Sequence, residues 1–167
     1  MITISEIMMP IVRDVRTKDE RDKLHEDMGE LEAALFRSNF ETFEKVLSAR
    51  LPEHTALVMR DICARSEFKN NLGALRTFLH DIKNTLDTFL LLKLTLAFKP
   101  SEEMINRLYE WTQQNLGSGV ILDIGHDTSI LGGVKIIFNG RYKEMTLVQM
   151  ITNTMVKEKT TIMGMIR

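Results

Sequence analysis

Three residues with acid–base or metal-binding side chains lie close together in the second half of the chain: Asp123, His126 and Asp127. A carboxylate beside an imidazole is a common pairing for proton transfer, and both groups can bind metal ions. The residues around them alternate between apolar and polar, so a strand is expected to end here and its side chains to diverge. The pattern therefore favours an exposed turn over a catalytic or metal site.

Two adjacent glycines, Gly132 and Gly133, follow this turn. A phosphate-binding loop places glycines between a strand and the N-terminus of a helix, and neither Gly-Lys-Ser/Thr nor G-x-G-x-x-G is present here. A structural turn fits better, with Asp127 and Ser129 bonding to the local backbone and Ile130 and Leu131 entering the core. The glycines would then let a neighbouring strand approach the backbone closely.

The remaining reactive side chains are isolated from one another in the sequence. His25, His54 and His80 lack the spacing of a metal site, and no serine lies in G-x-S-x-G. The single cysteine, Cys63, is interpreted as a small buried apolar residue. The sequence therefore predicts no catalytic residue, no cofactor and no metal, and hence a protein that is not an enzyme.

A basic face on the second half would be an alternative route to function, through nucleic acid. Lys135, Arg141 and Lys143 could contact phosphates, while Phe138 and Tyr142 could stack on bases. Phe138 is in register with core positions, however, and the three cations are typical of the solvated side of a hairpin. We therefore expect no nucleic-acid partner.

The composition points to a globular protein of a reducing compartment. The chain has 167 residues, 44 % of them hydrophobic, and a net charge of −1, which attracts neither nucleic acid nor anionic membranes as a whole. One cysteine cannot form an internal disulfide. The N-terminus lacks the features of a secretory signal, and no apolar run reaches the ~20 residues needed to span a bilayer. These features predict a soluble, intracellular protein.

The first half has helical periodicity. Thr17 with Glu20, and Ser38 with Glu41, match the capping box that begins many helices. Residues 67–92 are predicted to form one long helix, because apolar residues recur alternately at four and three positions. This seam consists of Phe68, Leu72, Leu75, Leu79, Ile82, Leu86 and Phe89. Packing inside a helical bundle is favoured over a coiled coil with a partner.

The second half changes to strand periodicity. Alternating runs flank a helix that begins after Ser101, and Asn139 with Gly140 gives a strong hairpin signal. The sequence thus predicts an α+β protein in which an N-terminal α-helical bundle (residues 1–92) is followed by a small β-α-β-β-β-α domain (residues 93–167) with a C-terminal helix.

Residues 94–147 resemble the C-terminal part of the delta subunit of F-type ATP synthases, the family of the oligomycin sensitivity conferral protein. A strand ending in Ala-Phe is followed by KPSEE, an amphipathic helix, another strand and DTSILGGVKIIFNG. The family signature is an acidic residue, a proline or small residue, Ser, two aliphatic residues and Gly-Gly. This chain supplies Asp127, Thr128, Ser129, Ile130, Leu131, Gly132 and Gly133, with Thr128 where proline is common.

The helical half agrees with this family in kind but departs in detail. The usual Tyr-Ala-x-Ala-Leu start is absent, and Pro10 interrupts the first residues. Residues 1–16 therefore form either an arm or a replacement for a missing helix, and the groove in which the family binds the alpha subunit is placed in question.

The resemblance implies a mechanical role. In this family the helical bundle binds the N-termini of alpha subunits in the catalytic head, and the C-terminal domain holds the b subunits of the peripheral stalk. The subunit thereby keeps the head from turning with the rotor during proton-driven ATP synthesis. It would lie on the cytoplasmic side of the inner (plasma) membrane, attached peripherally through the complex.

Two alternatives stay open. One is an unrelated two-domain binding module, such as an RNA-binding protein. The other is the E-type stator subunit of vacuolar or archaeal ATPases, which also ends in an α+β domain with a Gly-Gly strand. That family requires a long uninterrupted N-terminal helix, against which Pro52 and the capping boxes argue.

Overall fold

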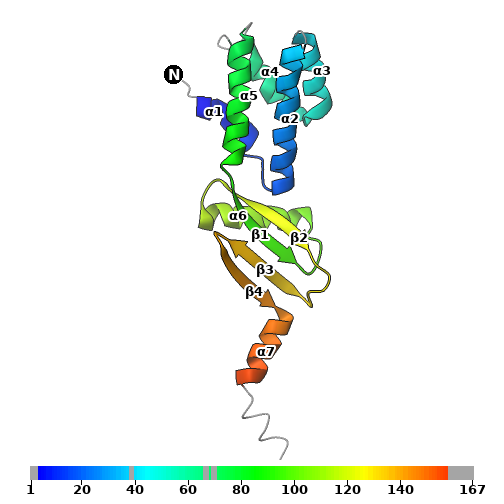
Figure 1. The fold of residues 1–167 in the computed structure, drawn as a ribbon, viewed down its shortest axis with the longest axis vertical. Coiled ribbons are helices and arrows are strands. Elements are labelled where there is room, and N and C mark those ends of the chain that lie inside the picture. The colour runs from blue at the N-terminus through cyan, green and yellow to red at the C-terminus, as the bar shows by residue number, and fades with distance from the viewer. Residues whose placement is uncertain (1–3, 38–39, 66–67, 69–70, 158–167) are drawn as a thin grey trace, which may run out of the picture. The chain divides into compact units, whose positions relative to one another are not determined.

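The computed structural model describes residues 4–37, 40–65, 68 and 71–157, and these form an α+β fold with helices first and strands later (Figure 1). The chain divides into two compact units, which we call unit 1 (residues 1–89) and unit 2 (residues 90–167). The expected division after residue 92 would cut a strand, because β1 spans Leu90–Leu96.

Unit 1 is built from helices, coloured blue to green in Figure 1. They are α1 (Ile4–Val12), α2 (Lys18–Arg37), α3 (Phe40–Arg50), α4 (Glu53–Ala64) and α5 (Leu72–Asp87). The longest of them, α2, packs against both α3 and α5. The core contains the fully buried side chains Met28, Leu31, Phe43, Leu47, Met59, Ile62, Leu75, Phe78, Leu79, Ile82 and Leu86. Its continuity across four helices is what makes these short elements stable, since isolated helices of this length are marginal in water.

The heptad seam continues past the end of its helix. Leu75, Leu79, Ile82 and Leu86 are buried as the seam predicts. The prediction of one helix over residues 67–92 is nevertheless wrong at both ends, because α5 covers only Leu72–Asp87. At the C-terminal end, the hydroxyl of Thr88 donates to the carbonyl of Thr85 at 2.7 Å, and the next residues join a sheet. Phe89 follows the helix and is half-buried.

The other end of the seam is set by a cap. The Asn71 side chain accepts a hydrogen bond from the amide of Ala74 at 3.0 Å and so begins α5. Phe68 therefore lies in a turn before the helix, where its ring packs on Phe78 with centroids 5.2 Å apart. Leu72, the first helical residue, is 42 % exposed.

The start of the chain contributes a helix. Ile7 and Ile11 on α1 are buried, and α1 contacts α4 and α5. Pro10 lies inside this helix, where its missing amide removes one hydrogen bond. The described part of residues 1–16 is therefore an element of the bundle rather than an arm. The second capping box, at Ser38, lies outside the described residues.

The first capping box is present. The amide of Thr17 donates to the Glu20 carboxylate at 3.1 Å, and the amide of Glu20 donates to the Thr17 hydroxyl at 3.3 Å. The Arg16 guanidinium also pairs with this carboxylate. Partial burial pushes the pKa of Glu20 up, but the hydrogen bonds and charge of Arg16 and the Thr17 amide outweigh it and hold the pKa below its usual value.

Substitution of this carboxylate gives a pH-dependent prediction. Because the folded pKa of Glu20 is lowered, its contribution to stability is present above the ordinary value of 4.5 and is lost as pH falls through the folded pKa. We expect Glu20→Gln to cost about 1 kcal/mol at pH 7, and the cost to shrink below pH 4.5. Urea unfolding at several pH values measures both. Glu26→Gln, at an exposed position on the same helix, is the control, and a pH-independent loss in Glu20→Gln would contradict the linkage.

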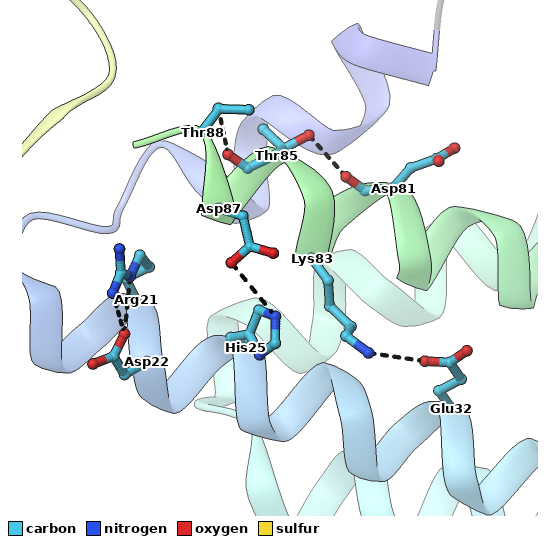
Figure 2. A network of polar contacts seen from close by, with 9 residues as sticks. All are labelled: Arg21, Asp22, His25, Glu32, Asp81, Lys83, Thr85, Asp87 and Thr88. Carbon is cyan, nitrogen blue, oxygen red and sulfur yellow. Dashed lines mark hydrogen bonds and ion pairs between the residues drawn. The ribbon is translucent and has the colours of Figure 1, made fainter. Parts of the chain in front are cut away.

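Polar side chains join α2 to α5 along one side of their packed faces (Figure 2). Lys83 lies 3.2 Å from the Glu32 carboxylate, and His25 lies 3.7 Å from that of Asp87. These pairs are partly exposed, so each adds little free energy beside the apolar core.

Unit 2 is a four-stranded sheet with helices. In order it contains β1, α6 (Glu102–Leu116), β2 (Val120–His126), β3 (Gly133–Phe138), β4 (Arg141–Thr146) and α7 (Leu147–Lys157). The order of strands across the sheet is β2-β1-β3-β4. The pair β1–β2 is parallel, while β1–β3 and β3–β4 are antiparallel. The predicted β-α-β-β-β-α succession and the α+β class are confirmed.

Helix α6 is the crossover between the two parallel strands. Ser101 caps its N-terminus by accepting from the amide of Met104 at 3.3 Å, and Gly117 follows its last residue with φ of +102°. One face of the sheet packs against it: Leu92, Leu94, Val120 and Leu122 form a buried cluster, against which Ile105, Leu108, Tyr109, Ile124, Val134, Ile136 and Phe138 pack.

Candidate functional site

The turn that precedes the paired glycines is held by one carboxylate. Asp127 accepts hydrogen bonds from the amide of Ser129 at 2.9 Å and from its hydroxyl at 2.6 Å. These bonds, with Lys135 at 3.8 Å, keep the pKa of Asp127 below its usual value. Ile130 is buried as expected, whereas Leu131 is 67 % exposed, so the expectation that both enter the core is wrong for Leu131. An aliphatic pair in a tight turn points its side chains in different directions, and only one of them meets the core.

The paired glycines lie between strands and permit a close contact. Gly133 is the first residue of β3, with φ of +103°, and a Cβ added there would lie 2.1 Å from the Met145 carbonyl oxygen. Gly132 has φ of +76°, and its carbonyl accepts from the amide of Leu147 at 3.0 Å. No helix begins after the pair, so its geometry is that of a strand junction rather than a phosphate loop.

The hairpin between β3 and β4 turns at the two expected residues. Asn139 and Gly140 have φ of +48° and +72°. Positive φ at both central residues is the requirement of a type I′ turn, whose twist matches that of the strands it joins. This turn sets the register in which Ile136 faces Lys143 and Phe138 faces Arg141.

The acid and histidine residues near the turn do not converge. Asp123 pairs with Lys93 and His126 with Leu96 in the parallel ladder, so their side chains lie on opposite faces of the sheet. Within the described parts of the chain, no three His, Cys, Asp or Glu side chains gather as metal ligands would. Cys63 is buried, and its burial raises the pKa of the thiol to about 11, which leaves it unreactive at neutral pH.

The proposed basic face on the hairpin is divided between two sides of the sheet. Lys135 pairs with Glu144, one residue out of step with Lys143 and Arg141, so it projects from the opposite face. Phe138 and Tyr142 are separated in the same way, because Phe138 pairs with Arg141 and Tyr142 with Ile137. A continuous cationic surface with neighbouring stacking rings is therefore not formed by these residues.

The structure contains a feature that sequence reasoning did not identify: an apolar groove between α6 and the sheet, which we call the sheet groove. Its volume is about 520 Å³. It is lined by Leu92, Leu94, Leu96, Met104, Leu108, Trp111, Thr112, Leu116, Val134, Ile136 and Phe138. The hydroxyl of Thr112 in this lining is engaged, since it donates to the Leu108 carbonyl at 2.7 Å. The groove can therefore bind an apolar surface, and its lining contains no acidic, basic or thiol side chain.

The sheet groove exists because α6 covers only part of the apolar face. Gln113 on α6 donates to the Val120 carbonyl at 2.8 Å, which holds this side of the helix toward β2. The opposite side of α6 carries Met104 and Trp111, and Trp111 is 53 % exposed. On the same face of the sheet, Met145 of β4 is paired with the groove residue Val134 of β3. Met145 is 48 % exposed. The alternating run on β3 predicts a buried face, but it does not predict that part of this face lacks a cover.

Unit 1 contains a second depression, between α1 and α4. It has a volume of about 560 Å³ and a mixed lining of Ile7, Pro10, His54, Leu57, Val58, Asp61, Ile62 and Arg65. Leu57 is 55 % exposed, and Arg65 lies 3.5 Å from Asp61. An apolar strip bordered by charges of both signs suits an amphipathic segment better than a small metabolite.

None of the described helices combines the length and the apolar character that crossing a bilayer requires.

Comparison with known proteins finds likeness among solved structures only. No protein-family description and no curated protein matches the chain. Among solved structures, a chain of the "Cryo-EM structure of Toxoplasma gondii mitochondrial ATP synthase hexamer, composite model" is similar, with 14 % identity and a TM-score of 0.34. That alignment covers 92 % of this chain and 93 % of the other. A similarity of this size carries no argument about fold or function.

Proposed function

We propose that this protein is a non-catalytic stator subunit of an F-type ATP synthase, related to the delta subunit. It would link the N-termini of alpha subunits to the b subunits of the peripheral stalk and lie peripheral to the membrane through that complex, on the cytoplasmic side of the inner (plasma) membrane. The role is to resist torque between the catalytic head and the rotor. Neither a cofactor nor a metal is part of the proposal.

The sheet groove is the observation that carries this proposal. Its lining is apolar, and its rim includes an exposed tryptophan, Trp111, and an exposed methionine, Met145. Exposed apolar surfaces of this kind mark protein-binding sites, and tryptophan is enriched among residues that dominate binding energy. The signature turn at Gly133 and the succession of helical and α+β units support the same proposal.

Two recesses on two units suit a linker. We assign the b subunits to the sheet groove and the alpha-subunit N-terminus to the depression between α1 and α4. Both partners would bind as amphipathic helices with apolar anchors at i, i+3, i+4 and i+7. Because one chain carries both sites, two contacts of moderate affinity give strong attachment together.

The E-type alternative fits the helices less well. That family requires a long uninterrupted N-terminal helix, whereas residues 4–37 divide between α1 and α2. The RNA-binding alternative loses one of its three cations from the shared face, because Lys135 projects from the other side of the sheet.

Capture of the two partners tests the proposal. The purified chain is expected to capture b and alpha subunits of the same ATP synthase at low and high salt. Trp111→Asp should weaken capture of b by about thirtyfold or more, the scale of losing a dominant interface residue, and leave capture of alpha unchanged.

A matched control uses the opposite face of the same sheet. Ile137 is 39 % exposed there, so Ile137→Asp places an equal charge outside the groove and should leave both captures intact. If the unaltered chain captures neither subunit, the stator function is excluded. Binding to single-stranded RNA and its dependence on salt would then be measured.

A further inference from the structure

We propose that the helix bound in the sheet groove carries two acidic residues four positions apart, which pair with Arg141 and Lys143 on β4. This inference rests on the sheet groove as the b-subunit site and adds the chemistry of the partner: an amphipathic helix with an apolar stripe and one acidic flank. The groove thereby selects its partner by charge as well as by shape.

The strand register places both cations on the groove side. Ile136 and Phe138 line the groove, and they pair directly with Lys143 and Arg141. Directly paired residues of an antiparallel ladder project from the same face. Arg141 and Lys143 therefore project from the groove side of the sheet, along β4, the edge strand that follows β3 in the strand order. Both side chains are exposed.

Neither cation has an ion-pair partner among the residues that the structure describes. Their neighbour Lys135 does, since it lies 3.8 Å from Asp127 on the other face. On α6, across the groove, the Arg107 guanidinium is paired with Glu103 at 2.6 Å. The β4 side thus carries uncompensated positive charge, so the acidic flank of the partner is expected to face β4.

The spacing of the cations fixes the spacing of the acids. Two residues along an antiparallel strand rise about 6.8 Å, and four residues along an α-helix rise about 6 Å. Carboxylates at i and i+4 of a helix lying along the strands therefore match Arg141 and Lys143 one to one. Apolar residues on the adjoining face of the same helix then enter the groove.

The chain's own last helix does not meet this requirement. The sequence of α7 is LVQMITNTMVK, which contains no carboxylate and ends in Lys157. Its exposed apolar residues, such as Met150 and Ile151, could enter an apolar groove, whether in the same molecule or in a second copy. They would leave both cations of β4 unpaired, so the charges favour a separate acidic partner.

Fluorescence of Trp111 provides the measurement, because it is the chain's single tryptophan and lies in the groove wall. The full chain is titrated with three synthetic helical peptides of about 18 residues that share one leucine stripe. The peptides differ only at two positions, i and i+4, beside this stripe. One peptide has Glu at both positions, the second has Gln and the third has Lys. We expect a blue shift on binding and an affinity for the Glu peptide about tenfold above that for the Gln peptide at low salt.

Charge reversal distinguishes pairing at Arg141 and Lys143 from a general attraction between the chain and an acidic peptide. The double variant Arg141→Glu/Lys143→Glu should lose the preference for the Glu peptide and bind the Lys peptide best. Lys135→Glu changes the same charge on the other face and should keep the original preference. Equal affinity of the unaltered chain for all three peptides would overturn the proposal.

The other occupants of the groove give different results. If α7 fills the groove, Val148→Asp/Ile151→Asp in the full chain would shift Trp111 emission to the red without any peptide, and the proposal fails. A stable dimer that this variant dissociates would show a second copy as the occupant and would also overturn it.

Failure of this inference differs from failure of the stator function. Capture of b that Trp111→Asp abolishes but Arg141→Glu/Lys143→Glu leaves intact keeps the function and overturns the acidic flank. A clear preference for the Glu peptide without capture of b keeps the acidic flank and excludes the b subunit as the partner.

Discussion

Replacing Gly133 by alanine is expected to destabilise unit 2 severely. An added Cβ would lie 2.1 Å from the Met145 carbonyl oxygen and 2.7 Å from the Thr146 Cα, both of them backbone atoms that cannot rotate away. The φ of +103° adds backbone strain of about 1–3 kcal/mol before the clash is counted. Urea unfolding followed by Trp111 fluorescence, which reports on unit 2, measures the loss.

The neighbouring glycine is the matched control. Gly132 also has positive φ, at +76°, but a Cβ added there would meet only the Leu147 Cβ, at an ordinary distance of 3.8 Å. We expect Gly132→Ala to lose about 1–2 kcal/mol from the backbone alone. Equal losses for the two variants would show that the close approach of β3 to β4 is not what requires glycine at position 133.

Replacing Phe78 by alanine is expected to have the largest effect in unit 1. Phe78 is 2 % exposed and packs against the Phe68 ring at 5.2 Å. Removal of a buried phenylalanine side chain typically costs about 3–5 kcal/mol, because lost burial and an unfilled cavity add together. Thermal unfolding followed by far-ultraviolet circular dichroism should show an early loss of helix.

Two further observations decide how that loss is interpreted. Leu72→Ala changes an exposed residue at the start of the same helix and should cost well under 1 kcal/mol. The urea transition of Trp111, in unit 2, should move little in Phe78→Ala if each unit has its own core. A parallel shift of both transitions would instead show that the two units unfold together.

Local signals in the sequence predicted much of unit 2. The positive φ angles at Asn139 and Gly140 follow from local steric limits of the turn. The cap at Ser101 follows from the unpaired amides in the first turn of α6, which need an acceptor. The burial predicted for Leu131 is wrong, because hydrophobicity does not show that the backbone of a turn directs one aliphatic side chain outward.

The end of α5 could not be placed from periodicity. The heptad spacing of Leu86 and Phe89 continues the seam, yet Leu90 begins a strand that pairs with Val120. Short apolar runs suit a buried helix and a central strand equally well, so only a pairing thirty positions away decides between them.

The sheet groove was hidden for a related reason. Its floor combines residues of β1 and β3 with one side of α6, and its charged rim depends on the register of β4. A linear sequence gives the alternation of each strand but not which part of the resulting face lacks a cover. The position of Lys143 beside the groove follows from its pairing with Ile136, which the sequence does not specify.

The place of β1 inside the sheet has a consequence for synthesis on the ribosome. The strand lies between β2 and β3, so both of its neighbours are made after it. Unit 1, whose helices rely on contacts within residues 1–89, can fold while β1 still has two unpaired edges. Until β3 emerges, the apolar run Leu90–Leu96 is open to wrong pairing, and delays in translation there should lower the yield of folded protein.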